Sequence, residues 1–279
     1  MTDQLAEVAA RLHAVRQVGA VVNAMRGMAG SRAQQAHQFQ PAVRAYAEVG
    51  RRAIEQALRL GGASGREESR SGRADAAPVL IVFGAEAGFA GGFADRVLEA
   101  ATALGEASWL LVGSRTAALA RERGLEIVWE TNLPARAAAL PALAGDLAEA
   151  LYRHIVERGA SRVEMLTSVW EGAAGLRFER RPLLPLDLAA LAADGGQPPL
   201  TTLPAAVLLA RLSEEYVYAC ICEAAVEAYA AENQARVNAM ASARSKIDEQ
   251  LRELQQLEHR VRQEAITAEV VELSTRRRR

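Results

Sequence analysis

The fold is decided by the stretch MASARSKIDEQLRELQQLEHRV, residues 240–261, in which an apolar side chain recurs at every third or fourth position. This spacing is the seam of a coiled coil, where such positions share one face of a helix. The stretch lies in a longer helix-forming segment, 203–274, for which Thr201 or Thr202 is the expected N-cap and Pro204 lies in the expected first turn. Its predicted seam contains Val207, Leu208, Leu212, Tyr216, Cys220, Ala224, Met240, Ala243, Ile247, Leu251, Leu254, Leu257 and Val261. About 70 helical residues would form a rod of roughly 105 Å, which needs a second helix to cover its seam.

The other end of the chain offers that second helix, over residues 5–60. Its predicted seam contains Leu5, Val8, Leu12, Val15, Val22 and Met25, and then Phe39, Val43, Tyr46, Ile54 and Leu58. If it is continuous, this helix is roughly 80 Å long. Pro41 removes one helical hydrogen bond and crowds the preceding turn, so a kink or local break is expected near Phe39–Gln40.

Charge distinguishes the first helix further. No acidic residue occurs from Val8 to Ala47, whereas five arginines do: Arg11, Arg16, Arg26, Arg32 and Arg44. One interpretation is a solvated helix face in an arginine-biased protein. The other is a positive rod that faces acidic surfaces of a partner, where opposite charge sets the registration.

The residues between the two helices have the pattern of an α/β domain. Strands are predicted at 79–83, 109–112, 125–129, 163–170 and 176–186, and helices at 93–104, 116–123 and 140–158. This alternation favours a mostly parallel sheet with helices on its faces. The segments 61–77 and 194–199, rich in glycine or proline, are expected to be linkers. The predicted fold class is therefore α+α/β: a long antiparallel coiled coil of terminal helices, 1–60 and 201–279, with a Rossmann-like domain at 78–200.

Bulk composition excludes several classes of protein. The 279 residues carry a formal net charge of −1, which does not suit a dedicated nucleic-acid binder. No apolar run is long enough to span a membrane, and the residues after Met1 lack the pattern of a signal peptide. An intracellular protein, soluble when alone, is expected. Cys220 and Cys222 point about 200° apart on a helix, so they are expected to be two apolar side chains rather than a disulfide or metal pair.

Motifs of catalysis are missing. The sole lysine, Lys246, is followed by Ile247, which excludes a phosphate-binding Walker loop. The four histidines show no spacing typical of metal ligands, so neither a metal nor a cofactor is expected. The glycine-rich turn 84–92 follows a strand and precedes a helix, a place where phosphates bind, but it does not match the dinucleotide fingerprint. A structural turn is favoured over a nucleotide site.

Several motifs, in order along nearly the whole chain, resemble the gamma subunit of F-type ATP synthases. Residues 21–32, VVNAMRGMAGSR, resemble the family's N-terminal helix signature, and 231–240, AENQARVNAM, resemble its S-E-x-x-x-R-x-x-A-M. Residues 262–272, RQEAITAEVVE, resemble R-Q-x-x-I-T-x-E-x-x-E. In the middle, 88–92, GFAGG, is similar to R-G-L-C-G-G, and 183–185 to L-L-P.

This resemblance implies a rotor. The coil would stand in the bore of a ring of three alpha and three beta subunits, and its foot would bind the epsilon subunit and the membrane-embedded ring of c subunits. Ion flow would turn the shaft, whose asymmetry would drive the catalytic sites on the beta subunits through their states. The chain itself would be non-catalytic, and it would lie peripherally at a bacterial inner membrane, on the cytoplasmic side.

The resemblance also assigns roles to individual residues. The positions that would contact or steady the shaft inside the catalytic ring are Met25, Arg26, Arg236, Arg262, Gln263, Thr267, Glu269 and Glu272. The glycines that would form a structural turn are Gly88, Gly91 and Gly92. Arginine–carboxylate hydrogen bonds to the beta subunits would form and break with each rotational step.

Departures from the family pattern suggest a divergent branch, such as a second, alternative bacterial ATPase. Asn23 replaces a lysine, Gly27 a methionine and Ala90 a cysteine, and the usual acidic–arginine pair reads Glu86-Ala87. The chain closes on four arginines, 276–279. The competing hypotheses are an α/β nucleotide-binding enzyme with helical arms, and a coiled-coil adaptor or arginine-tail nucleic-acid binder.

Overall fold

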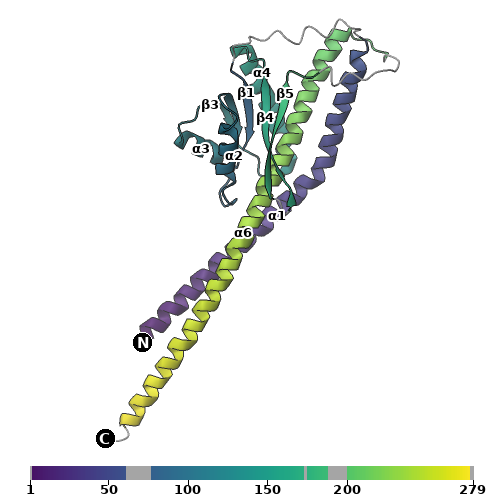
Figure 1. Ribbon diagram of the computed structural model, residues 1–279. Coiled ribbons are helices and arrows are strands. Elements are labelled where there is room, and N and C mark those ends of the chain that lie inside the picture. Colours follow the sequence, from purple (N-terminus) through teal and green to yellow (C-terminus); the bar gives the residue numbers. More distant parts are fainter. Residues whose placement is uncertain (1, 61–76, 173–174, 188–199, 277–279) are drawn as a thin grey trace. The chain divides into compact units, whose positions relative to one another are not determined.

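The computed structural model describes residues 2–60, 77–172, 175–187 and 200–276 (Figure 1). The linkers predicted at 61–77 and 194–199 lie outside these residues except for Ala77, as do Arg277–Arg279. The chain forms two compact units, one of residues 1–29 with 236–279 and the other of residues 30–235. Each unit has its own core and is considered by itself.

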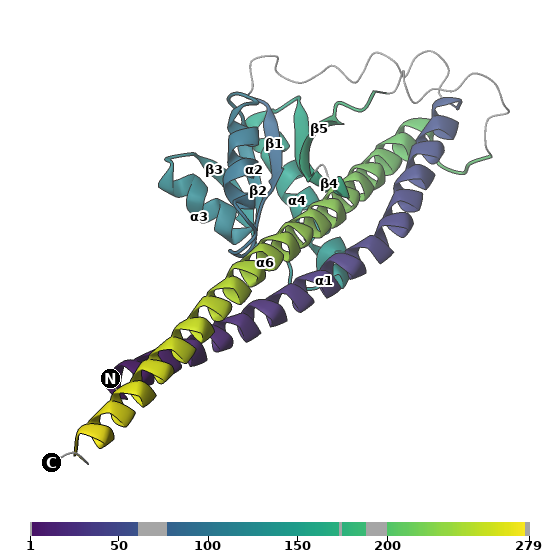
Figure 2. The same cartoon turned by 60° about the horizontal axis from the view of Figure 1, so that its bottom comes forward.

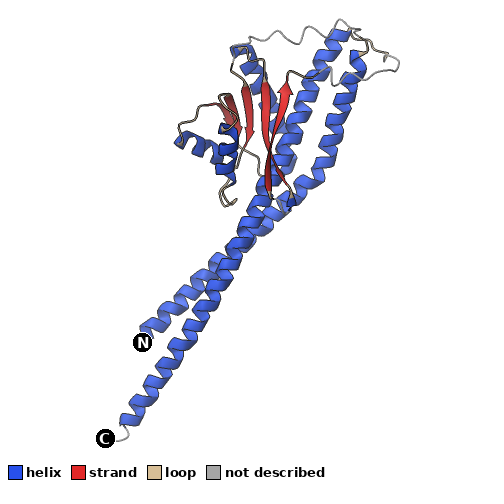
Figure 3. Ribbon diagram, in the orientation of Figure 1, coloured by secondary structure: helices blue, strands red, loops and turns tan. Residues whose placement is uncertain are grey.

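Two long helices dominate the secondary structure: α1 (Thr2–Leu58) and α6 (Ala205–Arg276), coloured blue in Figure 3. Both predicted terminal helices are confirmed. The expected N-cap is wrong, because α6 begins after Pro204, whose carbonyl accepts a hydrogen bond of 3.0 Å from the Leu208 N–H. The Thr201 hydroxyl instead accepts the Leu203 N–H at 3.1 Å, in a turn before the helix.

In the first unit the two helices pair antiparallel. Val8 and Leu12 of α1 form a buried cluster with Leu254 of α6, and Gly19 accepts a hydrogen bond of 3.2 Å from Arg244. The contacting residues have increasing numbers along α1 and decreasing numbers along α6, so the two helices run antiparallel, as expected of the coiled coil. A Cβ at Gly19 would stand 3.0 Å from the Arg244 guanidinium, so the absence of a side chain permits this close approach.

In the second unit the seam of α1 differs from the predicted one. Phe39 and Tyr46 are exposed to 43% and 42%, while alanines and Ile54 occupy the buried positions. The buried residues of this part of α1 are Ala33, Ala36, Ala47, Ile54 and Ala57. Phe39 was wrongly chosen as a seam residue because the choice followed side-chain size, whereas Tyr46 packs its ring edge-on against Tyr218 of α6 and Leu58 is half-buried. Small side chains are buried here because they let helices approach closely. On α6, Val207 and Leu257 are likewise exposed rather than buried.

Pro41 does not break α1. The helix continues through it from Thr2 to Leu58, and Figure 2 shows α1 curving without interruption. Pro41 is exposed, and buried or paired neighbours on both sides, Ala36 and Arg44, hold the helix to the rest of its unit. Of the two expected outcomes, a local break is therefore wrong, and a kink at Pro41 stays a prediction.

A five-stranded sheet forms the centre of the second unit. Its strands are β1 (Val79–Phe83), β2 (Ser108–Val112), β3 (Ile127–Thr131), β4 (Val163–Trp170) and β5 (Leu176–Leu184), in the order β3-β2-β1-β4-β5. All neighbours are parallel except β4 and β5, which form an antiparallel pair. The mostly parallel sheet is thus confirmed, with β3 shifted by two residues from its predicted place.

Helices cover both faces of this sheet. Alternate residues of β1 and β2 face opposite sides, as the two-residue repeat of a strand requires. One face packs against α2 (Phe93–Thr102) and α3 (Ser114–Glu122) through Leu80, Val82 and Leu111. The other packs against α4 (Leu140–Arg158) and the middle of α6 through Ile81 and Phe83, after a short helical turn, η3 (Ala137–Ala139).

Candidate functional site

The middle of α6 is a component of the core of the α/β unit. Nearly every residue from Val217 to Ala235 is buried or half-buried. Seven of these nineteen residues are alanines, which add little bulk and allow the sheet and α4 to lie close to the helix axis. Tyr229 extends further, and its hydroxyl donates to the Ala135 carbonyl at 2.9 Å. The helix therefore runs through this core rather than along its surface.

Glu227 ties three elements together at this place. Its side chain is only 2% exposed, and its carboxylate lies 2.8 Å from a nitrogen of Arg44 on α1 and 2.7 Å from one of Arg181 on β5. Arg44 also pairs with Glu223, one turn earlier on α6, at 3.3 Å. The hydrogen bond to Glu227 raises the pKa of Arg44. Two cations therefore balance one buried carboxylate and connect α1, α6 and the edge of the sheet.

One turn further along α6, Glu232 reaches the glycine-rich turn after β1. Its carboxylate, on a residue 2% exposed, accepts hydrogen bonds from the backbone N–H groups of Glu86, at 3.2 Å, and Ala87, at 3.4 Å. Backbone N–H groups at such a turn are the donors that hold phosphates in nucleotide-binding folds. Here they hold a carboxylate of the chain itself.

A second carboxylate fills the neighbouring position at the same edge of the sheet. Glu86 accepts hydrogen bonds from the backbone N–H of Ser114, at 3.0 Å, and from that of Leu133, at 2.7 Å. Ser114 is the first residue of α3, so Glu86 lies at a helix N-terminus, where negative charge is favoured. The Ser114 hydroxyl also donates to Glu86, at 2.9 Å.

Close backbone contacts make this turn rigid. The Ala85 N–H donates to the Thr116 hydroxyl at 2.7 Å, and the Thr116 N–H donates back to the Ala85 carbonyl at 3.1 Å. A Cβ on Gly84 would stand 2.5 Å from Thr116, and one on Gly113 would stand 2.7 Å from the Ala85 carbonyl oxygen. The turn and the start of α3 thus interlock in a way that only glycine at these two positions permits.

The three glycines assigned to the turn by resemblance have different environments. Gly91 and Gly92 have φ of 61° and 74°, in the left-handed region, and Gly92 caps α2. Gly88 lies in open space, since a Cβ there would meet nothing within 4 Å. Phe89 also has a left-handed φ, 62°, and its ring is 70% exposed.

This edge of the sheet is where an enzyme of this fold class would bind its ligand. The strand order reverses between β1 and β4, and ligands of open α/β sheets bind beyond the carboxyl ends of the strands at such a point. Glu232 and Glu86 occupy the donors of that region. Among the described residues no three His, Cys, Asp or Glu side chains are grouped as metal ligands. The arrangement can hold a helix firmly, because both carboxylates are engaged by backbone N–H groups of the chain itself.

The shaft residues assigned by resemblance lie on the two long helices. Met25 is half-buried, Arg26 is exposed and Arg236 is buried, 6% exposed. Further along α6, Arg262 pairs with Glu258 at 2.7 Å, and the Thr267 hydroxyl donates to the Gln263 carbonyl at 2.9 Å. The side chains of Glu269 and Glu272 lie outside the described residues. The role of all eight residues remains a prediction.

The motifs in the sequence did not indicate the two residues that fix α6 to the α/β domain, Glu227 and Glu232, although Glu232 lies within the motif 231–240. Their signal was present: two acidic residues in a stretch otherwise dominated by alanine, on a helix with no polar face there. Charged side chains in such a setting are buried and paired. Arg44 was expected either on a solvated helix face or facing an external partner, whereas it is paired within the chain.

The fold and this site define a class of protein with two long terminal helices, one of which passes through the core of an α/β domain. The chain matches the family model described as ATP synthase over residues 4–275. The ATP synthase gamma chain of Chlorobium luteolum is 26% identical over 287 residues, which cover 96% of each protein. The chain belongs to the ATP synthase gamma family.

Solved structures agree with this fold. A chain of the Euglena gracilis mitochondrial ATP synthase rotor, in rotational state 1, superposes with a TM-score of 0.63 at 14% identity, over 95% of this chain and 100% of that one. A chain of the Euglena gracilis OSCP/F1/c-ring assembly in rotational state 3 gives 0.66 at 13% identity, over 98% and 93%. A chain of the Tetrahymena thermophila central stalk and c-ring gives 0.52 at 18% identity, over 80% and 99%.

Proposed function

We propose that this chain, a rotor subunit of an ATP synthase, transmits torque between an ion-driven c-ring and a catalytic head of three alpha and three beta subunits. The observation that carries the proposal is that buried carboxylates of α6 fix this helix to the α/β domain. Glu227 and Glu232 are both buried. Glu227 pairs with arginines on α1 and β5, and Glu232 accepts a hydrogen bond from the turn after β1. A helix fixed this way inside a domain core rotates with that domain.

The exposed charges of the helices support contacts with a surrounding ring. Within the part of the chain that the structure describes, Arg11, Arg16 and Arg26 of α1 are exposed and make no ion pair. Arg262 of α6 is exposed too, and its pair with Glu258 within one helix is easily exchanged. We propose that these arginines meet acidic groups of the catalytic subunits, and that Met25, Gln263, Thr267, Glu269 and Glu272 lie in the same contact zone. Arg236, which is buried, would steady the coil from within.

The remaining assignments follow from the family. The catalytic sites would lie on the beta subunits, and the epsilon subunit and c-ring would bind the foot of the shaft, where the α/β domain is. The complex would place the chain at the cytoplasmic side of a bacterial inner membrane. None of the described helices is long and apolar enough to cross a membrane.

The rival function, a nucleotide-binding enzyme, is weakened by the occupied turn. A phosphate at the N–H groups of Glu86 and Ala87 would have to displace the Glu232 carboxylate, which would leave that carboxylate buried without those donors. It would also approach the carboxylate of Glu86. Both effects oppose binding of an anion at the one turn suited to it.

Assembly tests the proposal. The chain is mixed with the alpha and beta subunits of the same organism and separated by gel filtration. We expect one complex that contains all three proteins, with ATPase activity and one copy of this chain per three of each partner. Elution of the chain apart from an intact alpha–beta ring would contradict it. A variant without residues 262–279 should still fold, and in membrane vesicles it should couple ATP hydrolysis to ion transport less tightly than the full chain.

A further inference from the structure

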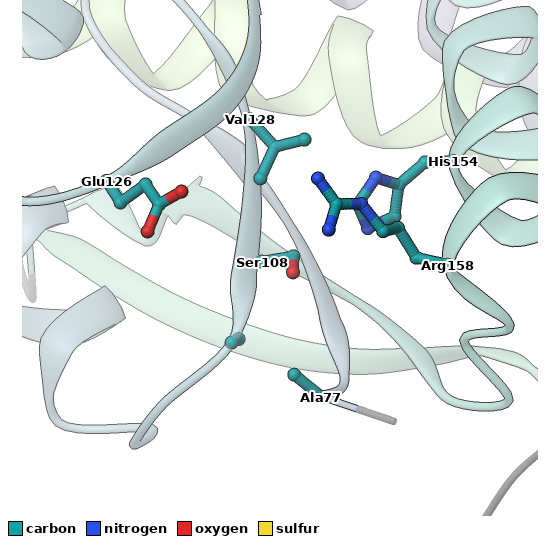
Figure 4. A pocket seen from close by; sticks show the side chains of 7 residues that line it. Ala77, Ser108, Glu126, Val128, His154 and Arg158 are labelled. Carbon is teal, nitrogen blue, oxygen red and sulfur yellow. The ribbon is translucent and has the colours of Figure 1, made fainter. Parts of the chain in front are cut away.

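The amino-terminal edge of the sheet carries a cavity that the torque function does not use. Its volume is about 290 Å³, and it lies where β2 and β3 begin, opposite the turn that holds Glu232. The lining residues are Ala77, Ala107, Ser108, Glu126, Val128, His154 and Arg158 (Figure 4). This size is at the lower end of the range for small-molecule sites.

Two basic side chains on consecutive turns of α4 face this cavity. In Figure 4 the His154 ring and the Arg158 guanidinium both lie on the α4 side of the cavity, across from Glu126. His154 is 92% buried, because only 8% of its surface is exposed. Among the described residues, neither side chain has a hydrogen-bond or ion-pair partner. The donors of both side chains are therefore open to a ligand in the cavity, and an acceptor from outside the chain would pair with them.

The chemistry of the walls defines what would fit. Arg158 offers planar, paired N–H donors, the Ser108 hydroxyl can donate as well, and His154 donates from either nitrogen once protonated. On the opposite wall, Glu126 contributes a negative charge. That charge disfavours a polyphosphate or any long polyanion, and it leaves room for one anionic group held against α4.

We propose that this cavity binds a single small anionic group of the phosphate type through Arg158, His154 and Ser108. The group can belong to free phosphate or to the headgroup of a phospholipid, since the chemistry at the donors is the same. The site is separate from the residues that hold α6.

Protonation of His154 strengthens the bound state. The charged groups around it are Arg158 and Glu157 on α4 and Glu126 across the cavity. Burial, together with the charge of Arg158, lowers the pKa of His154, so the ring is neutral at pH 7 in the free protein. An anion beside the ring raises that pKa again, and affinity therefore increases as the pH falls from 8 to 6.

The experiment is a titration of the full chain with inorganic phosphate, followed by NMR of the histidine ring protons. His13, His37 and His259 are exposed and serve as internal controls, and His154→Gln assigns the remaining signal. We expect a saturable shift at His154 alone. Because phosphate itself loses charge between pH 8 and pH 6, the pH dependence is measured with sulfate, whose charge does not change, and we expect tighter binding at pH 6 than at pH 8. Arg158→Gln should weaken binding about tenfold, the effect of losing a charged hydrogen bond.

A matched variant and a second probe complete the test. Arg153→Gln removes an exposed arginine of the same helix, paired with Glu149 at 2.7 Å, and should leave phosphate affinity unchanged. Vesicles with and without anionic lipid, added in phosphate-free buffer, identify a lipid source if only the anionic vesicles shift His154. Equal, non-saturating shifts at all four histidines with no vesicle effect would overturn the proposal, as would equal weakening by Arg153→Gln and Arg158→Gln. Circular dichroism of each variant confirms that it is folded.

Discussion

The carboxylate of Glu232 accepts a hydrogen bond of 3.2 Å from the backbone N–H of Glu86. The first residue belongs to the long helix α6 and the second to the turn after β1, and 146 positions separate them in the chain. Through this contact, the edge of the sheet where α/β proteins usually bind a ligand binds a side chain of α6 instead.

Glu232→Ala should destabilise the α/β unit by about 1–3 kcal/mol, because the N–H groups of Glu86 and Ala87 lose their acceptor. Glu232→Gln keeps an acceptor oxygen and should lose less. Urea unfolding followed by the fluorescence of Trp109, Trp129 and Trp170, all on sheet strands, measures the difference. Glu249→Ala, at an exposed position of the same helix, is the control. Equal stability of the Glu232 and Glu249 variants would show that the turn does not hold α6.

Glu227→Ala should cost about 2–3 kcal/mol. The change leaves Arg44 and Arg181 without their shared carboxylate, but Arg44 is 57% exposed in its side chain and can turn to water, which limits the loss. A double-mutant cycle with Arg44→Ala measures the coupling between the two residues, and we expect it to be favourable by at least about 0.5 kcal/mol. Strict additivity of the two single changes would contradict the ion-pair assignment.

Gly84→Ala and Gly88→Ala should differ sharply, although both lie in one glycine-rich turn. A Cβ at Gly84 would overlap Thr116, and we expect a loss of about 2–3 kcal/mol, as for an overpacked core. A Cβ at Gly88 meets nothing, so that variant should stay within about 0.5 kcal/mol of the parent protein. Thermal unfolding of the two variants compares them directly. If Gly84→Ala were as stable as the parent protein, the contact between Gly84 and Thr116 of α3 would have room for a methyl group.

Stability should decrease as the pH falls below about 6.5, and His154 should contribute to this decrease. Burial lowers the pKa of His154 in the folded chain, so the unfolded chain takes up the proton first. The contribution is complete above the unfolded pKa near 6.5 and is lost as the pH falls through the folded value. In phosphate-free buffer, urea unfolding at pH 7 and pH 5 should show a larger loss for the parent protein than for His154→Gln. If both proteins lost the same free energy of unfolding between pH 7 and pH 5, the pH dependence would come from groups other than His154.

Much of the architecture was predictable because its signals are local. The helix 140–158 and the strand 163–170 agree residue for residue with α4 and β4, since each is bounded by glycine, proline or charge and filled with a clear periodic pattern. Pairing between distant segments was harder. Phe39 and Tyr46 were placed in the seam by their size, but the buried face of that part of α1 is built mostly from alanine. Alanine is common on every face of both helices, so its spacing does not identify the buried one.

The hold on α6 could not be derived from spacing alone. Glu232 and Glu86 meet only because α6 passes the carboxyl edge of the sheet, which depends on the tertiary arrangement of two segments far apart in sequence. Arg44 could not be assigned from the sequence for the same reason, because its partners, Glu223 and Glu227, are on α6. The local sign that these charges are paired within the chain was the position of Glu227 and Glu232 in an alanine-rich stretch.

Rotation of a single complex is the measurement that tests the central claim most directly. Glu122→Cys places a thiol on the exposed end of α3 for a bead, and burial raises the pKa of Cys220 to about 11 and that of Cys222 as well, so both native thiols react slowly at neutral pH. The alpha–beta ring is fixed to a surface and ATP is added. The account predicts that the bead turns in one direction, in steps of a third of a turn. A complex that hydrolyses ATP while its bead only fluctuates about one angle would contradict it.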